Sequence, residues 1–332
     1  MKLPAIRIIV LALAMTSTAS AEKLVLIAGG GTGGDGEAAT NASMGQPFGV
    51  AIDKQGNLFI ADMTDHRVRK IDPKGIITTV GGTGKKGFGG DGGPATEGQF
   101  SGMHDLVVAD NGDIYIADSY NLRVRKIDAK TGRLSTVAGN GEKKIAGDGG
   151  SGEQASLDGV ASIYFDPTGT KLYITGFSTA VRILDVKTGI IDRVKGLPGG
   201  RSVAVDSKGN VYVGGGTTLR VMRPDGKVET LLDSKKSAPD ELKIGDNTKH
   251  LGFDADENVL IADDFGHQIK KYLVTEKKLV VLVGSGKSGK TGLGGPPLQA
   301  ELSAPHGIYY HAPTKLIYVC DSRNKRVLRI EP

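Results

Sequence analysis

Apolar and polar residues alternate along the chain in short runs that recur as a repeat. Residues 48–71 and residues 104–127 have the same length and align without a gap. Weaker copies begin at Ser162, Ser202, His250 and Gly307, which makes six copies in all. In each copy two alternating runs joined by a tight turn are followed by a polar turn and a third run. This pattern predicts short antiparallel strands joined by hairpins.

Most copies continue into a fourth run, such as residues 76–80. Four short antiparallel strands per unit, repeated about every 40 to 60 residues, are typical of β-propeller blades. A single blade cannot cover both of its faces, so consecutive blades are expected to pack side by side around a central axis. The sequence therefore predicts an all-β fold, a six-bladed β-propeller of four-stranded antiparallel blades.

The two ends of the chain are predicted to close the ring together. The sixth copy reaches Pro332 directly after its third run and has no fourth run of its own. The segment LVLIAGGGTGGDG from Leu24 parallels ITTVGGTGKKGFGGDGG from Ile77, where a fourth strand runs into a glycine-rich loop. We therefore expect a strand over residues 23–28 to complete blade six and to cover the edge that an open ring would expose. On this basis residues 22–332 form a single domain.

The first 21 residues have the features of a secretory signal peptide. Lys2 and Arg7 precede an apolar run that leads to an Ala-x-Ala site at residues 19–21. Removal of residues 1–21 lowers the formal net charge from +5 to +3, so the basic pI is weak support for a nucleic-acid partner, and none is expected. Cys320 has no second cysteine with which to form an internal disulfide. We expect a monomer in a bacterial-type periplasm or outside the cell, with no membrane anchor.

Two segments resemble a known family. PFGVAIDKQGNLFIADMTDHRVRKI at residues 47–71 resembles the NHL repeat, whose members form six-bladed propellers, and GFGGDGGPAT at residues 87–96 resembles the interblade loop of exported bacterial NHL proteins. The resemblance is weaker in blades three and four, where Thr175-Gly176 and Gly214-Gly215 replace the Ala-Asp pair that follows the second strand. NHL propellers include enzymes, RNA binders and protein-binding modules, so the resemblance implies the fold and does not decide the function.

Glycine is unusually frequent, with 50 in 332 residues, and much of it lies in the loops between blades. Asp35, Asp91 and Asp148 occupy the same phase in three of these loops, and a glycine follows each one. Asp-Gly favours tight turns with positive φ, whereas calcium binding would require more oxygen ligands than one carboxylate per loop. Residues 284–291 match the phosphate-loop pattern, but the Gly-Leu-Gly-Gly-Pro-Pro that follows cannot begin the required helix promptly, so nucleotide binding is not expected.

The loops that enter the first strands and leave the second strands meet at one end of the central channel, which we call the channel mouth. The residues at the entry to the first strands are Phe48, His104, Ala161, Arg201, Lys249 and His306, and the next residues are Gly49, Asp105, Ser162, Ser202, His250 and Gly307. The candidate ligand-binding residues among them are His104, Asp105, Arg201, Lys249, His250 and His306. Because histidine can act as acid, base or metal ligand and arginine can stabilise an anion, His104, Arg201 and His306 are also the candidate catalytic residues.

Two sets of residues are candidates for a divalent cation. APHGI at residues 304–308 is similar to the segment that supplies zinc-binding histidines in peptidylglycine amidating lyases, which are NHL-type propellers. That resemblance implies a Zn²⁺ site whose ligands are His104, His250 and His306. The alternative site, for Zn²⁺ or Ca²⁺, is a ring of carboxylates at the ends of the second strands, formed by Asp62, Asp118, Asp263 and Asp321. These carboxylates are expected to face the same opening, unless they cap turns and pair with neighbouring blades instead.

Two functions remain open at this point. Because the chain contains no complete catalytic motif, the leading hypothesis is an exported binding or scaffold module. Such a module would hold a protein or small-molecule ligand at the channel mouth and at the glycine-rich loops. The alternative is a metal-dependent hydrolase or lyase that resembles gluconolactonases or the amidating lyase, with its histidine and arginine site at the same mouth.

Overall fold

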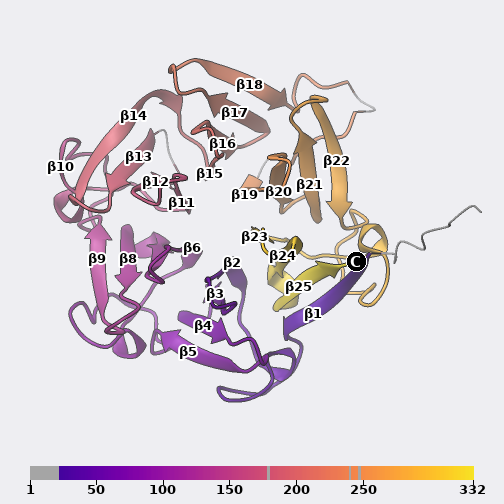
Figure 1. The fold of residues 1–332 in the computed structure, drawn as a ribbon, viewed down its shortest axis with the longest axis horizontal. Coiled ribbons are helices and arrows are strands. Elements are labelled where there is room, and N and C mark those ends of the chain that lie inside the picture. The colour runs from indigo at the N-terminus through magenta and orange to yellow at the C-terminus, as the bar shows by residue number, and fades with distance from the viewer. Residues whose placement is uncertain (1–21, 178–179, 239–240, 246–247) are drawn as a thin grey trace, which may run out of the picture.

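The chain closes into a ring of six β-sheets around a central channel (Figure 1). The computed structural model describes residues 22–177, 180–238, 241–245 and 248–332. The predicted signal peptide, residues 1–21, lies outside the described residues. Within the described part, no helix is long and apolar enough to cross a membrane.

The six sheets are the blades predicted from the repeat, and we number them by their order in the chain. Blade one contains β2 (Pro47–Ile52), β3 (Leu58–Asp62), β4 (Arg67–Ile71) and β5 (Ile77–Gly81). Blade two contains β6 (Met103–Val108), β7 (Ile114–Asp118), β8 (Arg123–Ile127) and β9 (Leu134–Ala138). Blade three contains β10 (Gly150–Ser151), β11 (Ser162–Phe165), β12 (Lys171–Thr175), β13 (Ala180–Asp185) and β14 (Ile190–Pro198).

The second half of the ring repeats the same order of strands. Blade four contains β15 (Ser202–Val205), β16 (Val211–Gly215), β17 (Thr218–Met222) and β18 (Val228–Asp233). Blade five contains β19 (Thr248–Phe253), β20 (Val259–Asp263), β21 (Gln268–Leu273) and β22 (Lys278–Val283). Blade six contains β23 (Ile308–His311), β24 (Leu316–Asp321), β25 (Arg326–Glu331) and β1 (Lys23–Gly29).

Short 3₁₀ turns lie in the loops of several blades. They are η1 (Ala39–Asn41), η2 (Ala95–Glu97), η3 (Ser119–Asn121), η4 (Gly152–Gln154), η5 (Pro297–Gln299) and η6 (Ser322–Asn324). Turns, followed by η5, come after the phosphate-loop match at residues 284–291. A phosphate loop needs a following α-helix to direct backbone N–H groups at the phosphates. The α-helix that this motif requires does not follow the match.

The ring is closed by the first strand, as predicted. Strand β1 pairs antiparallel with β25, from Lys23 opposite Glu331 to Gly29 opposite Arg326. Leu24 and Ala28 on β1 are fully buried. The strand therefore supplies both the missing hydrogen-bond ladder and part of the packing of blade six.

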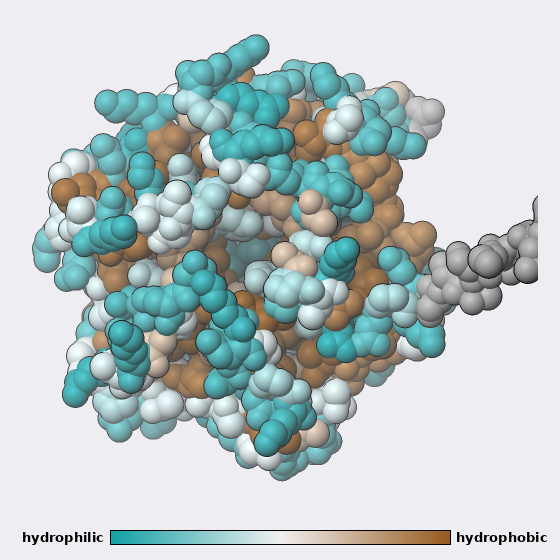
Figure 2. All heavy atoms as spheres, viewed as in Figure 1, coloured by the Kyte–Doolittle hydropathy of each residue, from teal (hydrophilic) through white to brown (hydrophobic). Residues whose placement is uncertain are grey.

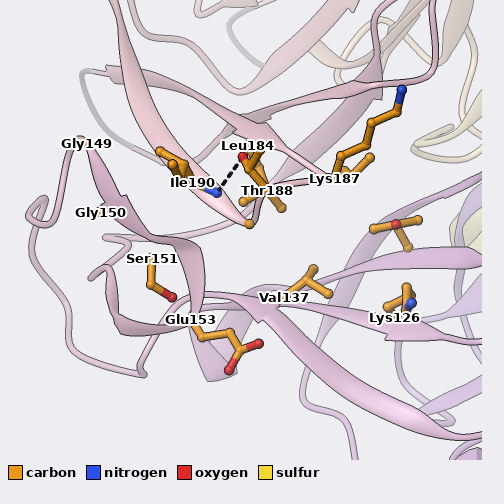
Figure 3. A pocket seen from close by; sticks show the side chains of 13 residues that line it. Lys126, Val137, Gly149, Gly150, Ser151, Glu153, Leu184, Lys187, Thr188 and Ile190 are labelled. Carbon is orange, nitrogen blue, oxygen red and sulfur yellow. Dashed lines mark hydrogen bonds between the residues drawn. The ribbon is translucent and has the colours of Figure 1, made fainter.

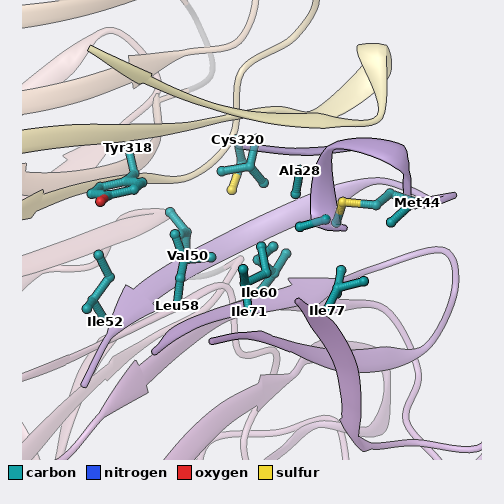
Figure 4. Close-up of a cluster of buried hydrophobic side chains, with 13 residues drawn as sticks. Ala28, Met44, Val50, Ile52, Leu58, Ile60, Ile71, Ile77, Tyr318 and Cys320 are labelled. Atoms are coloured by element: carbon teal, nitrogen blue, oxygen red, sulfur yellow. The ribbon is translucent and has the colours of Figure 1, made fainter. Parts of the chain in front are cut away.

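Neighbouring blades pack face to face through apolar side chains. Figure 4 shows the cluster between blades six and one, where Tyr318 and Cys320 of β24 lie near Val50 and Ile60 of blade one, all at most 6% exposed. Because successive strand residues point to opposite faces, Ile60 packs toward blade six, whereas its neighbour Phe59 packs toward blade two. The alternation in the sequence therefore covers both faces of a blade, which is why the strands are almost continuously buried.

The glycine-rich loops are fastened to the blades by ion pairs. The pairs are Asp35 with Arg69 (2.7 Å), Asp91 with Arg125 (2.7 Å) and Asp148 with Arg182 (2.8 Å), and in each one the arginine lies on the third strand of the following blade. The glycine after each of these aspartates has a φ between 78° and 86°, as the turn prediction requires. Since guanidinium groups engage these carboxylates, the structural interpretation is favoured over calcium binding.

Candidate ligand site at the channel mouth

The ring is hollowed at its centre, where the first strands of the blades meet (Figure 2). At the channel mouth the structure brings His104 of β6 and His306 of the loop before β23 together around Phe48 of β2. The ring of Phe48 stacks on His306 with 3.8 Å between centroids and meets His104 edge-on at 5.3 Å. The two imidazoles lie 5.6 Å apart, centroid to centroid. Both histidines are buried, at 3% and 2% exposure.

Main-chain carbonyls set the tautomer of both histidines. The Nδ1 of His104 lies 2.7 Å from the carbonyl oxygen of Gly102, and the Nδ1 of His306 lies 3.3 Å from that of Phe48. A carbonyl oxygen only accepts, so each Nδ1 carries the hydrogen and each Nε2 is left as an acceptor. The Nε2 of His306 is buried and makes no hydrogen bond in the structure.

Both imidazoles are neutral at physiological pH. Burial lowers the pKa of His104 to about 4, and the nearby Arg201 and Lys249 act in the same direction. The pKa of His306 lies well below its ordinary value, chiefly because of burial and then because of His104 and the same two cations. The mouth therefore presents two uncharged acceptors beside fixed positive charges.

Arg201 and Lys249 supply the positive charge. The guanidinium carbon of Arg201 lies 4.9 Å from the ring centre of Phe177, and its Nε is buried without a hydrogen-bond partner. The Nζ of Lys249 lies 3.0 Å from the carboxylate of Asp264. Burial lowers the pKa of both side chains, but arginine keeps its charge in proteins. A cavity of about 300 Å³ opens beside Arg201, lined by glycines of blades three and four and by Phe177.

Three exposed aromatic side chains near the mouth were not among the predicted residues. Tyr120, Phe177 and Phe265 are 56%, 47% and 64% exposed, respectively. Each lies two residues after the last residue of the second strand of its blade, and the rings of Tyr120 and Phe177 contact His104 edge-on. These aromatic residues could have been found in the sequence from their constant distance to the end of the second strand. That distance is visible only when the last residue of each strand is known.

His250 and Asp105 bond to each other across the channel. They occupy the same position in blades five and two, which stand opposite each other in the ring (Figure 1). The Nε2 of His250 lies 3.1 Å from Asp105 Oδ1, with exposures of 5% and 0%. Burial acts to lower the pKa of His250, but the Asp105 carboxylate outweighs it and raises that pKa above its usual value.

The four other residues at this level of the channel are small. They are Gly49, Ser162, Ser202 and Gly307. Asp105 also accepts the backbone N–H groups of Leu106 (2.8 Å) and Ile163 (3.0 Å). The small residues leave room for the imidazole to cross, so His250 and Asp105 form a partition beneath the mouth.

This pairing bears on the predicted zinc site. Since His250 directs its Nε2 to Asp105, it does not join the other two histidines in this structure. Among the described residues, no three His, Cys, Asp or Glu side chains come together in a way that could hold a metal ion. A metal at the mouth therefore stays a prediction, and it rests on His104 and His306.

The ring of carboxylates does not face the opening, contrary to expectation. Asp62, Asp118, Asp263 and Asp321 are at most 1% exposed. Each accepts the backbone N–H of a residue 17 or 18 positions earlier, at 2.7 to 3.1 Å, in the loop that leads into its own blade. Three of the four also bond a cation on the third strand: Arg125, Lys270 or Arg326. The carboxylates therefore fasten loops, which is the alternative role considered for them.

A larger groove lies away from the channel, between blades two and three (Figure 3). It has a volume of about 610 Å³ and lies where the glycine-rich loop at Gly149 and Gly150 passes between Val137 of β9 and Ile190 of β14. Two lysines, Lys126 and Lys187, line the groove, and Lys126 is engaged by Asp113 at 3.4 Å. Binding of a partner by the glycine-rich loops stays a prediction, and this groove is where it would take place.

Comparison with known proteins shows the same repeat and the same fold. Residues 20–87 match the Teneurin NHL domain and residues 100–127 match the NHL repeat. NHL repeat-containing protein 2 of Gallus gallus is 25% identical over 338 residues, which cover 85% of this chain and 46% of the relative. A Caenorhabditis elegans protein described as a probable peptidyl-alpha-hydroxyglycine alpha-amidating lyase is 35% identical over 92 residues, 27% of this chain and 25% of the relative. The chain thus spans less than half of the length of either relative.

Solved structures share the architecture at low sequence identity. An auxiliary nutrient binding protein from Bacteroides thetaiotaomicron superposes with a TM-score of 0.70 at 13% identity, over 93% of this chain and 76% of that one. A structure whose proposed activity is that of a gluconolactonase gives a TM-score of 0.59 at 13% identity, over 94% of this chain and 92% of that one. These likenesses extend to the fold alone. The match over residues 100–127 and the six closed blades together show NHL-type repeats in a six-bladed β-propeller fold.

Proposed function

We propose that the protein is an exported binding module that holds an anionic ligand at the channel mouth. The observation that carries the proposal is the group formed by His104, His306 and Arg201, in which two neutral acceptors lie near a guanidinium whose Nε has no hydrogen-bond partner. At this position of the repeat, histidine occurs in two of the six copies and arginine in one, so these residues are not repeat-wide. A repeat-wide residue is explained by the fold, whereas residues that break the repeat at a loop end need another explanation.

The chemistry of the group defines the ligand. A guanidinium binds a carboxylate or phosphate through charge-assisted hydrogen bonds. An imidazole Nε2 that can only accept favours a ligand hydroxyl or amide beside that anionic group. The exposed rings of Tyr120 and Phe177 add a surface on which a planar part of the ligand can stack. A hydroxy acid with an aromatic group, free or at the end of a larger partner, has all three features.

Binding and export are consistent with the similar proteins. One structural neighbour is described as an auxiliary nutrient binding protein of a bacterium. Residues 1–21 have the sequence features of a signal peptide. We therefore place the protein in the periplasm or outside the cell, and we expect it to act as a monomer.

Mandelate is a suitable probe because it combines a carboxylate, an adjacent hydroxyl and an aromatic ring. We expect isothermal titration calorimetry to show that mandelate binds more tightly than phenylacetate, which lacks the hydroxyl, and than mandelamide, which lacks the charge. The change Arg201→Gln should weaken mandelate binding at least tenfold. Arg133→Gln is the matched control because Arg133 is exposed on the hairpin between β8 and β9, at the opposite end of the blade. Equal affinity for the three probes, or an equal loss in both variants, would show that the mouth does not recognise anions.

A metal-dependent hydrolase or lyase is the second candidate function. It is favoured by the backbone carbonyls that hold the Nδ1 of His104 and His306, because metal-binding histidines are usually oriented through the other ring nitrogen in this way. The partial match to a protein described as an amidating lyase agrees with it. Metal analysis after incubation with Zn²⁺ or Ca²⁺ tests this candidate. One equivalent of metal that is lost in the His104→Ala and His306→Ala variants would favour the enzyme, whereas a protein without bound metal would favour the binding module.

A further inference from the structure

A second cavity lies in the channel on the other side of the His250 and Asp105 pair. The first strands of blades one, two, three, five and six line it, and its volume is about 170 Å³. Its walls include Val50, Leu106, Tyr164, Phe253 and Tyr309. We call this cavity the lower chamber.

The lower chamber is separate from the channel mouth. His250 forms part of its wall, whereas His104, Arg201 and His306, all of which the structure describes, do not line it. The side chain of His250 crosses to Asp105 at 3.1 Å between the two spaces. A molecule in the lower chamber would therefore make contacts different from those of a ligand at the mouth.

The lining of the lower chamber selects against charge. Its lining residues include no Asp, Glu, Lys or Arg, and the charge of Asp105 is already engaged by His250 and two backbone N–H groups. A charged ligand that moved from water into the chamber would find no free group of opposite charge there. That transfer is strongly unfavourable. Aromatic side chains form a large part of the wall, and rings pack favourably against rings at edge-on or offset geometry.

The volume of the lower chamber sets the size of the ligand. Protein interiors leave few voids larger than a water molecule, which occupies about 30 Å³ in the liquid. An apolar cavity of about 150 Å³ is known to accept benzene, so 170 Å³ accommodates one six-membered ring with a small substituent. One polar substituent can be accommodated, because the lining also includes residues with polar groups, His250, Tyr164 and Tyr309.

We propose that the lower chamber is a second binding site, which takes a small uncharged aromatic molecule with one polar group, of the size of phenol. This site does not depend on the proposed function of the mouth. Two different classes of small molecule would then bind at the two ends of one channel, separated by a pair of side chains.

Gly252 offers a direct way to fill the lower chamber. It lines the chamber on β19, and a Cβ added to it would meet only the carbonyl oxygen of Ile308, at an ordinary contact distance of 3.8 Å. Its φ lies outside the left-handed region, so Gly252→Val adds volume inside the chamber without backbone strain. Val108→Phe, from the opposite wall, is a second filling variant in case the first folds poorly. Thr78→Val on the exposed face of β5 is the control.

Phenol is the probe, and its affinity is measured by calorimetry, with the site located from methyl NMR shifts of Val50, Leu106 and Ile308. We expect phenol to bind the wild type and the Thr78→Val variant equally and at least tenfold more weakly to either filling variant. Benzoate, the charged analogue, should not shift these methyl groups. Arg201→Gln should leave phenol binding unchanged, which separates failure at the mouth from failure here. No phenol binding at millimolar concentration, or binding that both filling variants retain, would overturn the proposal.

Discussion

The bond between His250 and Asp105 should contribute measurably to the stability of the ring. Both side chains are buried, at 5% and 0% exposure, and they join blades that face each other across the channel. Replacing His250 with alanine leaves the Asp105 carboxylate buried without its partner. Removing one member of a buried ion pair typically costs about 3 to 5 kcal/mol.

The expected loss lies at the lower end of that range. Asp105 keeps two backbone donors, the N–H groups of Leu106 and Ile163, when the imidazole is removed. We therefore expect His250→Ala to lower the free energy of unfolding by about 3 kcal/mol. At roughly 2 to 4 °C per kcal/mol for a chain of this class, the melting temperature should fall by roughly 6 to 12 °C.

A double-mutant cycle isolates the contribution of the pair. Asp105→Asn removes the charge, so His250→Ala should cost about 1 to 3 kcal/mol less in that background than in the wild type. His311→Ala is the control, because His311 lies at the end of β23 and bonds only a nearby threonine in the structure. Unfolding is followed by circular dichroism in denaturant, since the chain has no tryptophan.

The pH dependence gives the same prediction a second test. The pKa of His250 is raised in the folded protein, so the folded state binds its proton more tightly than the unfolded state does. The stabilisation is therefore complete below the unfolded pKa, about 6.5, and is lost as the pH rises through the folded pKa. The difference in stability between wild type and His250→Gln should be larger at pH 6 than at pH 9. Additive single-variant losses together with a difference independent of pH would refute the reasoning.

Three further predictions concern the closure of the ring, the ion pair between Arg125 and Asp118, and the protonation of a buried carboxylate. Leu24→Ala on the closing strand should lower the free energy of unfolding by about 3 kcal/mol, because Leu24 is fully buried. The same change at Leu298, which is 56% exposed, should lower it by less than about 0.5 kcal/mol. Equal denaturation midpoints of the two variants would contradict closure by β1. Arg125→Met should destabilise the protein by at least about 3 kcal/mol, because it leaves the fully buried Asp118 without its cation. Arg133→Met on an exposed hairpin should have little effect. A similar loss in both variants would show that the ion pair of Arg125 does not stabilise the fold. Burial raises the pKa of Asp118 to about 6, so between about pH 6 and 4 the folded state binds a proton that the unfolded state does not. Acidification over that range should therefore stabilise wild type relative to Asp118→Asn by up to about 3 kcal/mol. Parallel profiles of stability against pH for the two proteins would contradict this.

The fold could be predicted from the sequence because the repeat carries it redundantly. The position of Ile60 holds isoleucine or valine in all six copies, and each of these side chains is buried in one of the hydrophobic clusters. The closing strand was also predictable, since the loop after Leu24 copies the loop after Ile77. A pattern repeated six times tolerates the poor matches in blades three and four.

The partners of individual charges could not be predicted from the same pattern. Asp35 recurs at the same phase of several loops, as Asp91 and Asp148. Its contact with Arg69 depends on how the loop folds back over the blade, which no local pattern specifies. Asp62 was expected at the opening for a similar reason. It lies at the end of a strand that points to the mouth, but its side chain turns inward to the N–H of Gly45, because a buried loop must satisfy its backbone donors.

The contact between His250 and Asp105 was more predictable than the other charge contacts but less predictable than the fold. Both residues were placed at the same level of the channel from their position in the repeat. They belong to copies five and two, and copies three apart in a ring of six face each other across the axis. Among neighbours as small as Gly49 and Gly307, the imidazole of His250 has a single carboxylate opposite it. Sequence phase and blade count together therefore place the two residues opposite each other, but the sequence resemblance assigned His250 to a zinc site, and the structure is what shows its bond to Asp105. The same reasoning explains why His250 forms a partition between the two proposed sites, whereas His104 and His306, one position earlier in their repeats, face the mouth.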